Sequence, residues 1–181
     1  DTDTRIPPEK IAYALNPFLP DDIVVQDSCE VPGDFHPRHC DSRKTYEYKI
    51  LNRTFPLRTR RLDTYFLYGK LNVERMQAAG DYLVGLHDFK SFCSANTAVE
   101  TTERRIYDLQ VERQGEVITI RVTGSGFLYN MVRIIAGTLI QAGRGELEPE
   151  EMREILEAKD RKAAGPTAPA HGLTMTGIDF L

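Results

Sequence analysis

The sequence predicts an α+β fold in which helices lie on one face of an antiparallel sheet. Residues 46–50 alternate with a period of two, as a half-buried strand does. Two further alternating segments flank Gln114-Gly115, which is typical of a β-hairpin. Apolar residues also recur at helical spacing elsewhere in the chain, so both kinds of element are expected. At 181 residues, one domain with a short extension is the expected organisation.

The first elements are a short helix and three strands. Pro7-Pro8-Glu9 is typical of a helix start, and Asn16-Pro17 of a helix end. Residues 23–25 and 46–50 are predicted strands, and a further strand is expected after the basic segment that follows residue 50. The alternation places three apolar side chains of the second strand on one face: Tyr46, Tyr48 and Ile50.

Asn72 caps the next predicted helix, which ends near Gly85. The hairpin pairs residues 106–113 with 117–123, and the alternation places six side chains toward one layer: Tyr107, Leu109, Val111, Ile118, Ile120 and Val122. Pro149 begins a last amphipathic helix with Met152, Ile155 and Leu156 on its apolar face.

The most informative segment is Gly124–Gly137, because it places Arg133 in an otherwise apolar helix. A guanidinium does not lose its charge, so a buried Arg133 needs an anion beside it. On helical spacing Arg133 shares a small, polar face with Gly126, Asn130 and Gly137, as in a pocket floor. The alternative is that Arg133 extends its side chain to solvent. The opposite face would enter the core through Leu128, Val132, Ile135 and Leu139.

The net charge of −4 is unevenly distributed. Residues 38–61 hold eight Lys or Arg and two acidic residues. Such a basic segment with interleaved aromatic residues can bind phosphates and stack bases, although a solvated strand and loop has the same composition. No apolar run is long enough for a membrane span and no signal segment is evident, so we expect a cytoplasmic protein. Because the chain begins at Asp1, we expect it to be part of something longer.

A metal site is weighed at His36, His39 and Cys40, which lie within five residues. These side chains occupy an irregular turn without a second cluster, whereas zinc normally takes three or four donors in fixed geometry. The sequence therefore predicts no metal. Gly124-Ser125-Gly126 also lacks the further residues that define a phosphate-binding glycine loop.

Several segments together closely resemble the tRNA pseudouridine synthase A family, in order and spacing, across nearly the whole chain. They are residues 35–38, 44–48, 85–92, 126–133, 158–161 and 169–173. Pro37 and Asp41 depart from the small residues usual in the family. The resemblance is to the C-terminal part of the family, with residues 1–20 expected to be an entry helix and linker from the N-terminal half. It implies two related α+β halves joined in one sheet, and a homodimer that holds tRNA in a basic cleft.

The resemblance also implies an isomerase that converts uridine to pseudouridine in the anticodon stem-loop, without a cofactor and without a role for DNA or membranes. The target base must leave its stack to enter the pocket. Arg133 and Tyr46 carry over as catalytic residues. Tyr46 packs on the target base and is a candidate for C5 proton removal. Met131 and Leu173 carry over as apolar walls, and Arg38 as an RNA contact.

The family's nucleophile is an aspartate in an Arg-Thr-Asp motif of the N-terminal half, which residues 1–181 do not contain. The nearest string, Arg61-Leu62-Asp63-Thr64, lies in a linker and is not assigned this role. We therefore predict that this chain alone does not isomerise uridine, and that the partner of Arg133 comes from elsewhere. Two other hypotheses stay open: a nonenzymatic RNA-binding or dimerisation module, and a metal-dependent hydrolase built on His36, His39 and Cys40.

Overall fold

The computed structural model describes residues 2–37, 40–94 and 99–181. The chain forms two compact units, Asp1–Cys40 and Asp41–Leu181. The division lies well beyond residue 20, so the first unit is longer than the entry helix and linker expected from the sequence.

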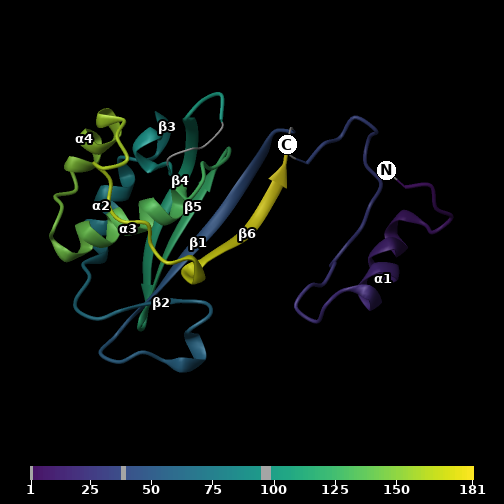
Figure 1. Cartoon of the computed structure of the whole chain (residues 1–181), viewed down its shortest axis with the longest axis horizontal. Helices are drawn as coiled ribbons and strands as arrows, with labels where there is room; N and C mark the ends of the chain where they lie inside the picture. The colour runs from purple at the N-terminus through teal and green to yellow at the C-terminus, as the bar shows by residue number, and fades with distance from the viewer. Residues whose placement is uncertain (1, 38–39, 95–98) are drawn as a thin grey trace. The chain divides into compact units, whose positions relative to one another are not determined.

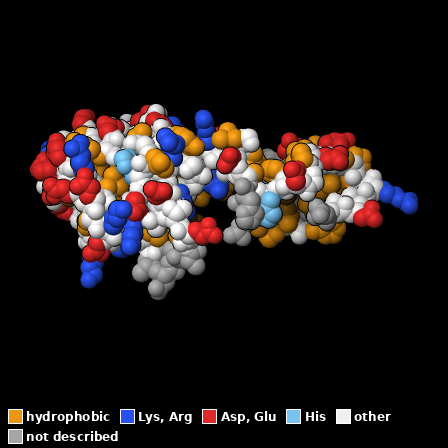
Figure 2. All heavy atoms as spheres, turned by 90° about the horizontal axis from the view of Figure 1, so that it is seen from above, with side chains coloured by type: hydrophobic (Ala, Val, Ile, Leu, Met, Phe, Trp, Pro, Cys, Tyr) orange, Lys and Arg blue, Asp and Glu red, His pale blue; other side chains and the backbone are white. Residues whose placement is uncertain are grey.

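The first unit is a short helix with an extended return segment. Its helical part consists of η1 (Pro8–Lys10), α1 (Ile11–Leu15) and η2 (Asn16–Phe18), as expected from the proline positions. Ser28 joins the return segment to the helix, since its Oγ donates to Pro8 O (2.6 Å) and accepts from Ala12 N (3.0 Å). Ala12 is this unit's one buried hydrophobic residue among those described. Figure 2 accordingly shows hydrophobic side chains across the surface of this unit.

The strand expected at residues 23–25 does not form. Asn16 instead binds the backbone there, because its Oδ1 accepts from Val25 N (2.8 Å) and its Nδ2 donates to Val25 O (3.0 Å). The side-chain amide therefore takes the place of a neighbouring strand, and Ile23 and Val24 stay exposed.

The second unit contains one six-stranded sheet (Figure 1). Its strands are β1 (Ser42–Asn52), β2 (Tyr65–Leu67), β3 (Gly85–Asp88), β4 (Glu103–Gln114), β5 (Val117–Gly124) and β6 (Leu173–Phe180). The order is β2-β1-β5-β4-β3. β6 runs antiparallel to the first part of β1, while β2 runs parallel to the last part. All other pairs are antiparallel. β3 and β6 were not among the strands expected from the sequence.

Three helices cover one face of this sheet, so the predicted α+β class is confirmed (Figure 1). They are α2 (Val73–Asp81), α3 (Met131–Arg144) and α4 (Glu151–Ala158). The predicted cap of α2 is present, since Asn72 accepts a hydrogen bond from Arg75 N. Short 3₁₀ turns η3 (Arg58–Arg60), η4 (Lys90–Phe92) and η5 (Ala170–Gly172) connect the elements. Between sheet and helices lies a continuous apolar core.

The prediction that Tyr107 faces this core is wrong. The pairing of β4 with β5 shifts between Ile106 and Asp108, which places Ile106, Leu109 and Val111 in the core. Tyr107 is the extra residue of this β-bulge and is 38% exposed, with the Arg43 guanidinium 4.9 Å from its ring centroid. The other hairpin residues expected in the core, Ile118, Ile120 and Val122, are fully buried.

No helix in the described part of the chain is both long enough and apolar enough to cross a membrane.

Candidate functional site

Helix α3 carries the arginine that the sequence singled out. Most of its fourteen residues are buried, including Val132, Ile135 and Leu139, as the helical spacing predicted. Arg133 is only partly buried and lies in the first turn rather than in the middle of the helix. Its neighbour Asn130 ends the preceding loop in the left-handed region, with φ of 61°. This conformation turns the chain sharply into the helix and is one that asparagine tolerates.

Two acceptors fix the guanidinium of Arg133. Its Nε donates to Ala168 O at 2.7 Å, and its Nη1 donates to Asn130 Oδ1 at 2.9 Å. Ala168 N in turn donates to Arg133 O at 3.1 Å, so the backbone of Ala168 binds both the side chain and the backbone of Arg133. A guanidinium has five N–H groups, and these contacts use two of them. No described carboxylate forms an ion pair with Arg133, which leaves its charge available to a ligand.

The segment that carries Ala168 packs tightly on α3. A Cβ at Gly137 would lie 1.8 Å from Pro166 O, and one at Gly165 would lie 2.8 Å from Thr138 Cα. Thr138 Oγ1 also accepts a hydrogen bond from Gly165 N at 3.0 Å. These contacts require glycine at both positions. The prediction that Gly137 forms part of an open pocket floor is wrong, because Pro166 fills the space.

Tyr48 of β1 holds the other end of this segment. Its ring is fully buried, and its hydroxyl donates to Pro169 O at 2.8 Å. Burial raises the pKa of the Tyr48 phenol well above its ordinary value, with a further rise from Tyr65 and a small opposing effect of Arg133. Tyr48 therefore stays a neutral hydrogen-bond donor at physiological pH. Gly172 lies directly against this ring, since a Cβ there would come within 2.8 Å of Tyr48 Cζ.

Tyr46 lies two residues before Tyr48 and shares its face of β1. It is partly buried and packs edge-to-face against Phe127, with centroids 5.1 Å apart and an interplanar angle of 81°. Its hydroxyl makes no hydrogen bond to a described residue, although that of Tyr48 does. The ring is thus held by packing while its polar end is left for a ligand.

These residues surround one cavity of about 350 Å³, which is the size of a small-molecule site. Its lining comprises Tyr46, Phe127, Leu128, Tyr129, Asn130, Met131, Val132, Arg133, Ala170 and Leu173. Of the ten, one is charged and the others are mainly aromatic or aliphatic. Such a cavity suits a flat, uncharged ring with an anionic group on its edge.

The structure thus brings four of the five predicted site residues to one cavity: Arg133, Tyr46, Met131 and Leu173. Gly126 does not line it and precedes α3. Arg38 lies outside the described residues. Asp63 sits in a turn, where it pairs with Arg60 at 2.8 Å, and does not line the cavity.

The supporting roles of Phe127 and Asn130 were not predicted from the sequence. Phe127 supports the ring of Tyr46, while Asn130 orients Arg133. Asn130 Nδ2 also donates to Ser94 Oγ at 2.9 Å, which fixes the amide so that its oxygen faces the guanidinium. An asparagine immediately before an apolar helix was the available signal for this position.

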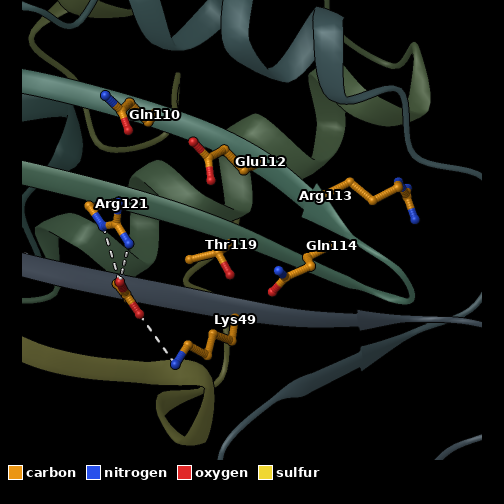
Figure 3. A pocket seen from close by; sticks show the side chains of 8 residues that line it. Lys49, Gln110, Glu112, Arg113, Gln114, Thr119 and Arg121 are labelled. Carbon is orange, nitrogen blue, oxygen red and sulfur yellow. Dashed lines mark hydrogen bonds and ion pairs between the residues drawn. The ribbon is translucent and has the colours of Figure 1, made fainter.

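A second cavity lies on the open face of the sheet and differs in charge. Figure 3 shows side chains of β1, β4 and β5 on the side of the sheet away from the helices. There Glu47 accepts from Arg121 at 2.8 Å and pairs with Lys49 at 3.2 Å. Arg121, and then Lys49, hold the pKa of Glu47 below its usual value despite its burial. The carboxylate of Glu47 thus pairs with two cations, and Glu112 adds a second acidic side chain to the lining.

Metal binding is not supported by the described part of the chain, where no three His, Cys, Asp or Glu side chains are grouped to hold an ion. His39, one of the three residues weighed from the sequence, lies outside the described residues.

Comparisons with known proteins identify the family. The family model for tRNA pseudouridine synthase matches residues 79–180. The chain belongs to this family. The match includes Met131, Arg133 and Leu173, and Tyr46 precedes it.

Relatives of the tRNA pseudouridine synthase family extend the match over nearly the whole chain. Proteins named tRNA pseudouridine synthase A are 46% identical over 179 residues in Thermoanaerobacter sp. (strain X514) and 46% over 180 residues in Bacillus subtilis (strain 168). A third, from Bacillus pumilus (strain SAFR-032), is 47% identical over 181 residues. Each match covers 99% of this chain and 73% of the relative. These relatives are therefore longer than the 181-residue chain.

Proposed function

We propose that this protein isomerises uridine to pseudouridine in tRNA. The observation that supports this most is the cavity in which the free side of the Arg133 guanidinium, the ring of Tyr46 and the side chain of Leu173 meet. Its aromatic and aliphatic lining suits a single pyrimidine that has left its stack. The names of the relatives point to the same substrate. We further propose the anticodon stem-loop as the site of action, a homodimer as the working form and the cytoplasm as its location.

The reaction is an isomerisation, so it needs no second substrate, and we propose that it proceeds without a cofactor. The bond between N1 of uracil and C1′ of ribose breaks, the base turns, and C5 bonds to C1′. The proton on C5 leaves, and N1 gains one. A carboxylate assists the bond cleavage as a nucleophile. We propose that it comes from a segment outside residues 1–181 and lies against Arg133, whose positive charge favours its ionised form.

The residues of this chain then have distinct roles. Arg133 holds and ionises the carboxylate through the N–H groups that Ala168 and Asn130 leave free. Tyr46 lines the cavity and stacks on the extruded base, and its hydroxyl is proposed to help remove the C5 proton. Met131 and Leu173 exclude water from the base, and Arg38 is proposed as an RNA contact.

Tritium release from tRNA labelled at C5 of uridine tests this function. The product of the whole gene should release tritium at an enzymatic rate. Arg133→Lys should abolish release, because lysine keeps the charge but cannot hold Ala168 O and Asn130 Oδ1 with one planar group. The 181-residue chain alone should release none, since it lacks the carboxylate. Release by the Arg133→Lys enzyme at the wild-type rate would disprove the role of Arg133.

A further inference from the structure

Another cavity of the sheet unit, at the end of β1, is basic and carries an exposed aromatic ring. It has a volume of about 590 Å³ and lies where β1 ends and β2 leads toward α2. Its lining is Asn52, Arg53, Thr54, Tyr68, Gly69, Lys70, Leu71 and Arg113, so three residues are basic and none is acidic. The cavity on the open sheet face has two acids in its lining, as does the cavity on the other side of Lys70. We refer to this cavity as the basic groove.

The side chains of the groove are positioned by a hydrogen-bond network centred on Asn52. Asn52 Nδ2 donates to Leu67 O at 3.0 Å and to Gly69 O at 2.7 Å. Its Oδ1 accepts from Arg113 Nη2 at 3.0 Å. Gly69 has φ of +94°, a conformation that side chains rarely adopt. Asn52 therefore fixes the turn that presents the two residues flanking Gly69, together with a guanidinium from β4.

The groove has unneutralised positive charge. Arg53 pairs with Glu116 at 3.1 Å, but the charges of Lys70 and Arg113 form no ion pair with a described residue. Lys70 is exposed, and Tyr68 is 70% exposed beside it. In a chain of net charge −4, such a site attracts an anion, and an exposed tyrosine ring offers a surface on which a base can stack.

The groove lies on the same side of β1 as the cavity of Arg133. Asn52 is six residues after Tyr46, an even number, so both side chains face the helices. At about 3.3 Å per residue, the two positions are about 20 Å apart along the strand. One structured RNA arm covers this span easily. One tRNA can therefore reach both cavities.

We propose that the basic groove binds the phosphodiester backbone of the substrate tRNA, with one base stacked on Tyr68, about 20 Å from the target uridine. This inference rests on the proposed function, since it concerns the same tRNA. The contact anchors the substrate without taking part in the chemistry. Lys70 contributes affinity that depends on salt, and Tyr68 contributes affinity that does not depend on charge.

Binding of a fluorescent tRNA transcript, measured from about 50 to about 200 mM salt, tests the groove. Lys70→Gln should weaken binding by about tenfold at the lower salt concentrations and reduce the slope of log K against log salt by about one. Tyr68→Ala should weaken binding about fivefold or more at all salt concentrations, while Tyr68→Phe retains it. Lys162→Gln is the matched control, because Lys162 is also exposed and unpaired among the described residues but does not line the groove.

Equal binding by the Lys70→Gln and Lys162→Gln proteins would overturn the groove assignment. Tritium release from the same preparations separates this failure from a failure of the proposed function. If the wild-type protein binds tRNA and releases tritium while both lysine variants behave alike, only the groove is wrong. If the wild-type product of the whole gene neither binds nor releases tritium, the proposed function fails and the groove with it. Because Lys70 and Tyr68 are exposed, neither substitution disturbs the core.

Discussion

Replacing Gly137 with alanine should disturb both the fold and the site. The new Cβ would lie 1.8 Å from Pro166 O and 2.9 Å from Pro166 C, and both are backbone atoms. A real Cβ essentially never comes within 3.0 Å of another heavy atom, so this carbonyl must move by at least about 1.2 Å. Two residues later in the same segment, Ala168 exchanges hydrogen bonds with Arg133. The displacement is therefore transmitted to the guanidinium.

Three terms determine the size of the effect on stability. Overpacking a dense interior costs about 1–3 kcal/mol. Loss of the two hydrogen bonds between Ala168 and Arg133 costs about 0.5–1.5 kcal/mol each. Alanine in place of glycine within a helix returns about 1 kcal/mol. The free energy of unfolding should fall by about 1–5 kcal/mol, and a loss of about 2 kcal/mol lowers the melting temperature of a protein of this size by about 4–8 °C.

Gly143→Ala is the matched control, because Gly143 is an interior residue of the same helix. A Cβ there would meet Met76 Cγ at 2.8 Å and Met76 Sδ at 2.9 Å. Both are atoms of a thioether side chain and not of the backbone, so, although Met76 is buried, it can shift more readily than Pro166 O. The gain in helix propensity then offsets the contact, and the free energy of unfolding should change by less than about 1 kcal/mol.

Urea unfolding of the three proteins, followed by circular dichroism, measures these differences. In the complete enzyme the Gly137→Ala protein should also lose about 100-fold in turnover, since a shift of about 1 Å in a catalytic group has that effect. Gly143→Ala should keep its turnover. If the Gly137→Ala protein is as stable as the Gly143→Ala protein, Pro166 can move freely and the reasoning is refuted.

Three further predictions concern side chains of β1. Tyr46→Ala should reduce turnover far more than it reduces tRNA affinity, because phosphate contacts dominate affinity. Full tritium release by the Tyr46→Phe protein would reject a role of the hydroxyl in proton removal. Tyr48→Phe leaves Pro169 O without its donor and should lower the free energy of unfolding by about 1–3 kcal/mol at pH 8. Because the pKa of Tyr48 is raised in the folded protein, its contribution to stability is fully present below about pH 10 and is lost progressively at higher pH. Urea titrations should therefore show the free energies of unfolding of the two proteins approaching each other at high pH. Glu47→Gln should lower the free energy of unfolding at neutral pH, because pairing with Arg121 lowers the pKa of Glu47 in the folded state. The difference in free energy between the two proteins should disappear as the pH falls below the ordinary pKa of glutamate and Glu47 takes up a proton. A difference that is unchanged at pH 3 would contradict this.

Local patterns were sufficient to predict the elements whose packing follows their own periodicity. The β4–β5 hairpin, the cap of α2 at Asn72 and the buried stripe of α3 all agree with the sequence. β6 is different, because its apolar residues alternate in two phases that change near Gly177. A bulge in its pairing with β1 absorbs this change, between Thr45 and Tyr46. The period-two pattern is thus broken in the sequence while the strand itself continues.

The errors at Tyr107 and at residues 23–25 have the same kind of cause. In both places a local apolar pattern gave the prediction, and an interaction with another segment changed the outcome. At Tyr107 the bulge between β4 and β5 turns the ring to the open face. At Val25 the side chain of Asn16 satisfies the backbone instead of a strand. Register shifts and side-chain acceptors of this kind leave no periodic signal in the sequence.

The candidate site was also only partly predictable from the sequence. Arg133 could be recognised because a charge in an apolar segment is unusual, yet its surroundings depend on residues about 35 positions away. Ala168 has no side chain that could reveal its role, since it acts through its backbone oxygen and nitrogen. Gly137 is required not because it leaves a space but because the segment that carries Ala168 fills it. The free part of the guanidinium therefore faces the cavity in a direction set by backbone packing. A substitution that preserves every polar side chain, such as Gly137→Ala, should consequently be more damaging to Arg133 than the loss of many surface charges.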